Sequence, residues 1–240
     1  MLTTFLTLFD LRGAGDYLPT LLRGAATSLA LTFCILLISL PLGLLIALAK
    51  LGRSRLLRSC ASVYIEVIRG TPALLQLFYI YFVLPSFGIR FDPFMAGVVG
   101  LSINYSAYLA EVYRAGIAAV PQGQIEAAKA LGMSRRTMLR LIVLPQAIRV
   151  VIPPLGNYGI SLFKDTSLVS IVTVKELIFT GQIISSTNFQ YATVFTLIGA
   201  IYLAFSYPSA LLVRWLERRM SVGNKAATMG GSQQATAGTP

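Results

Sequence analysis

The sequence has no histidine, two cysteines and few charged residues, and each shortage excludes a class of site. Without histidine, the chain lacks a common zinc ligand and the side chain that most often acts as a general base near neutral pH. Cys34 and Cys60 each lie in or beside an apolar run, which indicates small residues within helices rather than a disulfide framework. We therefore expect no catalytic residue, no metal site and no cofactor bound by this chain.

Charge is scarce for the length of the chain. Only 12% of the 240 residues are charged and 55% are hydrophobic, whereas a soluble domain usually carries about 25% charged residues. The net charge is +11, but the basic residues lie between apolar runs rather than in one patch. That spacing is typical of cytoplasmic loops in membrane proteins and argues against a nucleic-acid partner. The composition predicts an all-α, multi-pass membrane protein.

Five apolar segments predict five transmembrane helices, because a spanning helix needs about 20 mostly apolar residues. The fourth is expected to begin near Arg149 and to break at the sequence FKDTS, and the fifth to begin near Phe189. Residues 24–220 then form one five-helix domain. A lead-in segment, 1–23, is expected at the outer membrane surface, and a disordered polar tail at 221–240. The predicted spans are 24–49, 60–86, 93–118, 149 to the break at 163–167, and the later part of 177–213.

The basic residues predict the orientation of these spans. Most of them follow the first, third and fifth spans, and with five spans these three groups fall on the same side of the membrane, which must be the cytoplasm. The N-terminus is then outside, and the C-terminus and the loop 119–146 are cytoplasmic. The three groups are Lys50, Arg53, Arg55 and Arg58; Arg114, Lys129, Arg135, Arg136, Arg140 and Arg149; and Arg214, Arg218, Arg219 and Lys225.

Polar residues inside the spans predict a path for a solute, because intramembrane charges usually face a bundle interior or a water-filled cavity. Asn104, Tyr108 and Glu111 recur at helical spacing and share one face. Asn157, Ser161 and Lys164 share a face of the fourth span in the same way, with Asp165 adjacent. Gly70 and Pro72 interrupt the second span and can leave carbonyl groups free to line a cavity. The predicted path residues are Arg69, Thr71, Asn104, Tyr108, Glu111, Ser161, Lys164, Asp165 and Thr166. The alternative is that Glu66–Arg69 and Glu111–Arg114 are ion pairs that only hold helices together.

The loop between the third and fourth spans is amphipathic and basic. Apolar residues at helical spacing predict a first helix over 121–131, and Gly132 suits a left-handed helix end. Ser134 can cap a second helix over 135–143, which Pro145 ends or bends. This helix–turn–helix either enters a groove on a partner protein or rests on anionic lipid.

The sequence of this loop resembles the EAA loop of ABC importer permeases. The pattern consists of EAA at Glu126–Ala128, Gly132, and Leu144–Pro145 at the spacing of that loop. The stretches RGTPALLQLFYIYF, YSAYLAEVYRAGIAAVPQGQIEAA and KDTSLVS resemble the branch of histidine, glutamine and arginine permeases. The resemblance extends over most of residues 17–220.

The resemblance implies a type I importer core in the bacterial inner membrane that carries a polar amino acid or a close derivative. It implies a soluble binding protein, a second permease subunit and an ATPase subunit that holds ATP and Mg²⁺. Because the chain has no GxxxxGK[ST] motif, it is not itself expected to be an enzyme. An ion-coupled secondary transporter, or a permease for another small polar solute, is the alternative. The implied coupling residues are Glu126, Ala127, Ala128, Gly132, Leu144 and Pro145.

Overall fold

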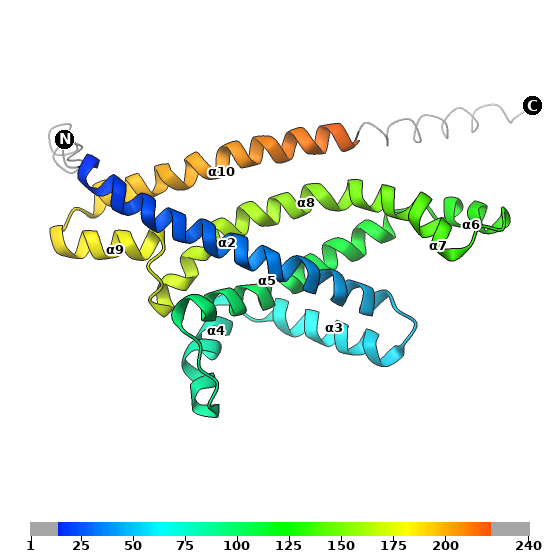
Figure 1. Ribbon diagram of the computed structural model, residues 1–240, viewed down its shortest axis with the longest axis horizontal. Coiled ribbons are helices and arrows are strands. Elements are labelled where there is room, and N and C mark those ends of the chain that lie inside the picture. Colours follow the sequence, from blue (N-terminus) through cyan, green and yellow to red (C-terminus); the bar gives the residue numbers. More distant parts are fainter. Residues whose placement is uncertain (1–13, 222–240) are drawn as a thin grey trace, which may run out of the picture.

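The computed structural model describes residues 14–221, and regular structure within this range is entirely helical (Figure 1). The long elements run roughly along one axis of the molecule, and the predictions for residues 1–13 and 222–240 lie outside the described residues. The α-helices are α2 (Ala14–Leu51), α3 (Arg55–Gly70), α4 (Ala73–Phe78), α5 (Pro93–Ala118), α6 (Gln122–Ala130), α7 (Arg135–Met138), α8 (Leu144–Asp165), α9 (Leu177–Asn188) and α10 (Tyr191–Ser221).

The first helix begins earlier than the first predicted span. α2 starts at Ala14 rather than near Gly24, and Asp16 in its first turn favours this start because a negative charge complements the helix dipole. The buried side of α2 carries Leu31 and Ile35, which pack in a core cluster with Leu101 of α5. α2 and α5 therefore form the centre of the bundle.

The second predicted span, 60–86, is not one straight helix, and the interruption predicted at Gly70 and Pro72 is present. α3 and the arm that follows it, Ala73–Phe87, are bent by 101° at a short break. Thr71 has an extended backbone, with φ −118° and ψ 143°, because the proline at position 72 disfavours a helical residue before it. The arm consists of α4, a π-helical turn η1 (Tyr79–Val83) and a 3₁₀ turn η2 (Leu84–Phe87), and it projects sideways from the bundle (Figure 1).

The second loop helix and the fourth span form one continuous helical segment. α7, the π-helical turn η3 (Leu139–Val143), α8 and the 3₁₀ turn η4 (Thr166–Val172) follow one another without interruption. The prediction that Pro145 could end the helix is wrong: the π turn, in which Leu144 N–H donates to the Leu139 carbonyl, precedes the proline and adjusts the hydrogen-bond ladder. The predicted break at FKDTS is not a break in the helical segment: α8 ends at Asp165, and the chain continues directly as the 3₁₀ turn η4.

Three described helical segments are long and apolar enough to cross a membrane, or four if α3 and the arm make one broken span. α5 is not among them, although its bounds agree with the third predicted span, 93–118. The reason lies in its position, since half of its 26 residues are buried against other helices. A helix enclosed by protein needs fewer lipid-soluble side chains than one that faces lipid.

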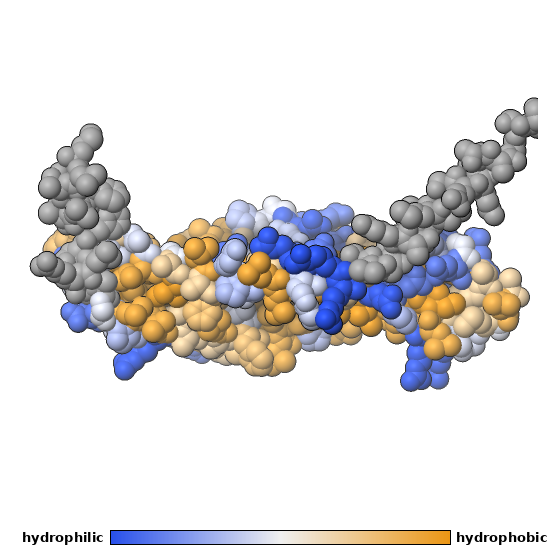
Figure 2. Space-filling model, turned by 90° about the horizontal axis from the view of Figure 1, so that it is seen from above, coloured by the Kyte–Doolittle hydropathy of each residue, from blue (hydrophilic) through white to orange (hydrophobic). Residues whose placement is uncertain are grey.

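The segments that carry the described members of the three basic groups lie toward one end of the bundle. The turn after α2, the α6–α7 loop and the last turns of α10 all lie at the same end (Figure 1). Figure 2 shows apolar side chains over the opposite half of the visible face and hydrophilic ones over the last turns of α10. In the last turns of α10, the guanidinium of Arg219 stacks on the ring of Trp215, with its carbon 4.3 Å from the ring centroid.

Glycines allow the helices to approach closely, as is common in membrane bundles. A Cβ atom on Gly43 of α2 would lie 2.9 Å from the Leu109 Cβ and 3.0 Å from the Ser106 carbonyl oxygen of α5. Neither α5 atom can move without moving the α5 backbone. By contrast, a Cβ atom on Gly199 of α10 would meet nothing within 4 Å.

We expect Gly43→Ala to destabilise the protein by about 1–3 kcal/mol, because overpacking a tight contact forces the backbone apart. Gly199→Ala is the matched control and is expected to be neutral or to stabilise by up to about 1 kcal/mol, since alanine favours helix. The thermal unfolding midpoints of the detergent-solubilised variants measure the difference. Equal midpoints for the two variants would contradict the close approach of α2 and α5.

Candidate functional site

A polar cavity of about 450 Å³ lies where the break after α3 meets α5 and α8. Six of the predicted path residues line it: Arg69, Thr71, Asn104, Tyr108, Ser161 and Asp165. The other lining residues are Gly70, Pro72, Ala73, Tyr105 and Tyr158. Segments distant in sequence thus bring one cation, one carboxylate and several hydrogen-bonding groups to a single cavity.

The two charges of this cavity are held differently. The Arg69 guanidinium lies over the ring of Tyr108, 5.2 Å from the centroid, in a cation–π contact. The Asp165 carboxylate accepts a hydrogen bond of 2.7 Å from the hydroxyl of Tyr105, a residue only 4% exposed. Neither charge has an ion-pair partner in the described part of the chain, residues 14–221. Both therefore remain available to a solute with charges of opposite sign.

The alternative ion pair Glu66–Arg69 is not formed within residues 14–221. Both residues are exposed. Glu66 instead lines a neighbouring cavity of about 430 Å³, together with Arg69, Tyr108 and Glu111. The prediction that this pair serves only to join helices is therefore wrong.

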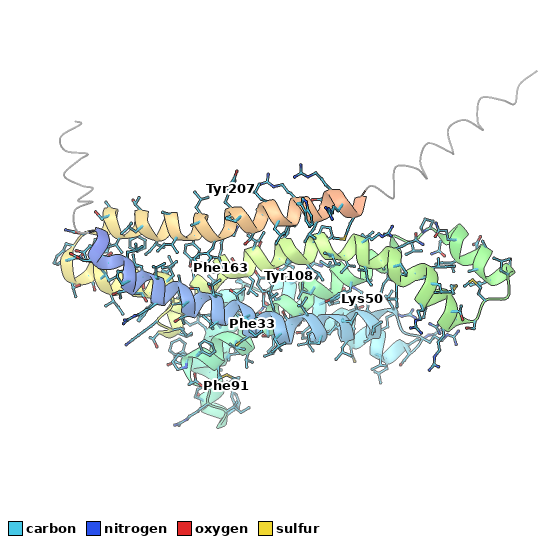
Figure 3. The ribbon with its side chains drawn as sticks, turned by 45° about the horizontal axis from the view of Figure 1, so that its top comes forward. Phe33, Lys50, Phe91, Tyr108, Phe163 and Tyr207 are labelled. Carbon is cyan, nitrogen blue, oxygen red and sulfur yellow. The ribbon has the colours of Figure 1, made fainter. Side chains whose placement is uncertain are left out.

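Three cavities follow one another along the bundle. The third, of about 270 Å³, is lined by Arg69, Tyr108, Glu111 and Tyr158 among others, so Arg69 and Tyr108 are common to all three. Figure 3 shows Tyr108 within the bundle and Lys50 nearer the end that carries α6 and α7. The row of cavities therefore continues from the α3–α4 break toward Lys50.

Glu111 is engaged by two cations. One carboxylate oxygen lies 2.8 Å from Lys50 Nζ and the other 2.9 Å from the Arg114 guanidinium. The predicted Glu111–Arg114 pair is therefore confirmed, and Lys50 is an additional partner that the sequence pattern did not indicate. Because both oxygens are occupied, Glu111 is less suited than Asp165 to receive an ammonium group.

Three predicted path residues do not line the 450 Å³ cavity, and one of them, Glu111, lines the two neighbouring cavities instead. Thr166 is fully buried, and its hydroxyl donates to the Phe163 carbonyl. Lys164 is exposed and lies outside the lining. On α8 the lining residues are Tyr158, Ser161 and Asp165, which recur every three or four residues and form one face. The face predicted through Ser161 and Lys164 is therefore offset by one residue.

The α6–α7 loop has the predicted helix–turn–helix form. Gly132 has φ +69°, and the N–H of Met133 donates to the Ala128 carbonyl at 3.1 Å, which closes the end of α6. The Ser134 hydroxyl accepts from the Thr137 N–H at 3.2 Å and caps α7. The side chain of Gln146 also donates to that of Gln124, so α6 is tied to α8.

The six residues of the EAA pattern divide by exposure. Ala128 is buried at 1% exposure and packs α6 onto the rest of the chain. The exposed members are Glu126, Ala127, Gly132, Leu144 and Pro145. The exposed members lie on the loop and on the start of α8, which together form an accessible surface at one end of the bundle (Figure 1).

The sequence pattern missed Tyr105 and Tyr158 as lining residues and Gln76 as a hydrogen-bond partner of the lining. Gln76 Oε1 accepts from Asn104 Nδ2 at 3.1 Å. Tyr105 follows Asn104 directly and was outside the predicted polar face. A tyrosine within an apolar span can be recognised, because its hydroxyl requires a partner when it is buried.

Comparison with known proteins gives one consistent result. Residues 39–222 match the family "Binding-protein-dependent transport system inner membrane component". The chain is 39% identical to glutamine transport system permease protein GlnP of Escherichia coli strain K12, over 89% of this chain and 99% of the relative. It is 40% identical to L-cystine transport system permease protein TcyB of Bacillus subtilis strain 168, over 85% and 88% respectively.

The fold agrees with this relationship. A chain in the crystal structure of an amino acid ABC transporter with histidines is 41% identical and superimposes with a TM-score of 0.84, covering 88% of this chain and 98% of that one. The chain therefore belongs to the family of binding-protein-dependent transport system inner membrane components and has the all-helical fold of type I ABC importer permeases.

Proposed function

We propose that this chain is the membrane permease subunit of an ATP-driven importer that carries a polar amino acid across the bacterial inner membrane. The observation that carries the proposal is the cavity between apolar helices that presents Arg69 and Asp165, two charges of opposite sign that form no ion pair within residues 14–221. A free amino acid is a zwitterion and needs both. The named transport systems of the relatives, for glutamine and for L-cystine, support an amino acid as the solute.

The two charges have distinct roles in this proposal. The Arg69 guanidinium offers a planar fork of donors to a carboxylate. Asp165, with one oxygen engaged by Tyr105, offers its remaining acceptor positions to an ammonium group. Asn104, Tyr108 and Ser161 supply further polar groups to the same cavity. Thr71 lies beside Arg69 at the break.

ATP is hydrolysed by a partner subunit, which binds ATP and Mg²⁺, while this chain transmits the motion. The exposed loop with Glu126, Ala127 and Gly132 enters a groove on that subunit, and its movement rocks the helices between two packed arrangements. In this arrangement α2, the α3–arm pair, α5, the α7–α8 segment and α10 are the five spans, with the N-terminus outside and the loop in the cytoplasm.

A second permease subunit, identical or similar, completes the translocation path. Arg69, Gly70 and Asp165 line the cavity and are exposed in the single chain. One chain therefore does not enclose a solute, and a paired chain is needed to exclude water and lipid from it. A soluble binding protein delivers the amino acid to the outer side.

Reconstitution tests the proposal. The permease, its candidate ATPase and its binding protein are placed in lipid vesicles, and ATP hydrolysis and uptake of a radiolabelled mixture of protein amino acids are measured. We expect the loaded binding protein to stimulate both activities together. Uptake driven by an ion gradient without ATP would show a secondary transporter instead, and ATP-driven uptake of a different solute class would overturn the assignment to amino acids.

A further inference from the structure

The break between α3 and α4 leaves backbone groups that need partners. The last carbonyl groups of a helix have no acceptor role within it, and lipid supplies no water to satisfy them. At this break the Thr71 hydroxyl donates to the Val67 carbonyl at 2.9 Å. The Ile68 carbonyl accepts from the same hydroxyl at 3.4 Å, and both it and the Thr71 carbonyl accept from a side chain beyond the bend.

That side chain is Gln76, in α4. Its Nε2 group donates to Ile68 O at 2.8 Å, to Thr71 Oγ1 at 2.8 Å and to Thr71 O at 3.2 Å. Its Oε1 atom accepts from Asn104 Nδ2 of α5 at 3.1 Å. One amide thus connects the end of α3, the residue at the bend, α4 and α5.

These contacts surround the cavity without placing Gln76 in it. Thr71 and Asn104, which are hydrogen-bonded to Gln76, both line the cavity. The rest of the bend, Gly70–Ala73, and Arg69 near the end of α3 also line it. Gln76 is not a lining residue. A change in its hydrogen bonds would alter the angle of the cavity wall and the position of the Arg69 guanidinium.

The arm has its own packing, which is independent of Gln76. Leu77 is fully buried in the main core cluster, and Ile80 is 8% exposed. Cβ positions built on Gly100 of α5 lie close to both of these side chains. The apolar contact keeps α4 against α5, so the hydrogen bonds of Gln76 are left to fix the geometry of the break.

We propose that Gln76, together with Asn104, is a positioning residue that holds the bend after α3 and thereby sets the shape of the solute cavity. Its effect on transport rests on the function proposed above, whereas its effect on the bend does not. Gln76→Glu keeps an acceptor for Asn104 but removes the donors to Ile68 and Thr71. Gln76→Met keeps a side chain of similar length but removes the hydrogen bonds to Ile68, Thr71 and Asn104. Gln182→Met, on an exposed position of α9, is the matched control.

The bend is measured directly by distances between spin labels in the assembled transporter. Cys60 on α3 is exposed and takes one label, Ser86→Cys on the arm takes the other, and Cys34→Ser removes the remaining thiol. We expect a narrow distance distribution in the parent and in Gln182→Met, and a broader or displaced one in both Gln76 variants. Unchanged distributions in the Gln76 variants would overturn the proposal.

Transport is measured with a radiolabelled mixture of protein amino acids. We expect uptake to fall about tenfold in Gln76→Glu and Gln76→Met, as for the loss of partly buried hydrogen bonds, with basal ATP hydrolysis unchanged and only a small fall in the thermal midpoint. A large fall in the thermal midpoint with proportionate loss of both activities would show a merely structural role and overturn the positioning role. If the parent takes up no amino acid, the proposed function fails, while the distances still decide whether Gln76 holds the bend.

Discussion

Glu126→Lys is expected to abolish ATP-driven uptake while the helical bundle stays folded. Glu126 is exposed on α6, and its carboxylate has no hydrogen bond or ion pair to the rest of residues 14–221. A surface substitution of this kind changes stability by about 0.5 kcal/mol or less. In a partner groove that receives the carboxylate, however, reversed charge costs several kcal/mol, which corresponds to a loss of roughly 100-fold or more.

The measurement compares uptake, ATP hydrolysis and thermal midpoint in reconstituted vesicles. Glu126→Gln is the matched control, because it keeps the size and hydrogen-bonding capacity of the side chain without its charge. We expect intermediate uptake for this control. Normal uptake by Glu126→Lys would remove Glu126 from the coupling surface.

Gly132→Asp tests the same exposed surface of the loop by adding a side chain where the chain has none. Gly132 has φ +69°, a left-handed conformation that costs most other residues about 1–2 kcal/mol of stability and aspartate less. A Cβ atom at this position would meet nothing within 4 Å. The variant should therefore fold and still fail to transport, because only a bound partner occupies the space. Gly123→Asp, also open and in the first turn of α6, places the same charge elsewhere on the loop and is expected to be tolerated.

The local features of the loop could be predicted because their causes are local. Gly132 adopts the left-handed conformation and Ser134 caps α7, as expected from one glycine and one hydroxyl at a helix boundary. α5 begins at Pro93 and ends at Ala118 for similar reasons, since Asp92 caps it and Pro93 occupies its first turn. Signals of this kind act within a few residues and need no knowledge of the fold.

The direction of a bend and the partners of a side chain could not be predicted in this way. The residues at 70–72 indicate a weak point in the helix but not the angle of 101°, because the contacts that α4 makes with α3 and α5 lie across the bend. Lys50 was expected only to mark the cytoplasmic end of the first span, whereas the crossing of α2 and α5 places it on Glu111. Such contacts join residues far apart in sequence, so no spacing rule reveals them.

Asp165→Asn is expected to reduce amino acid uptake by roughly 100-fold, because it removes the charge proposed to pair with the ammonium group and would leave that group unpaired in a desolvated cavity. The asparagine side chain keeps an oxygen that can accept from Tyr105. Tyr105→Phe removes only that hydroxyl, and a smaller loss of about tenfold is expected, as for one hydrogen bond to a charged group. Uptake by the reconstituted transporter measures both.

Lys164→Gln is the control that separates the observed face of α8 from the face predicted by the sequence pattern. Lys164 is adjacent to Asp165 and also charged, but it is exposed and does not line the cavity. Its loss is therefore expected to leave uptake unchanged. If Lys164→Gln abolished uptake and Asp165→Asn did not, the solute would follow the face through Ser161 and Lys164, and the cavity with Arg69 and Asp165 would not be its path.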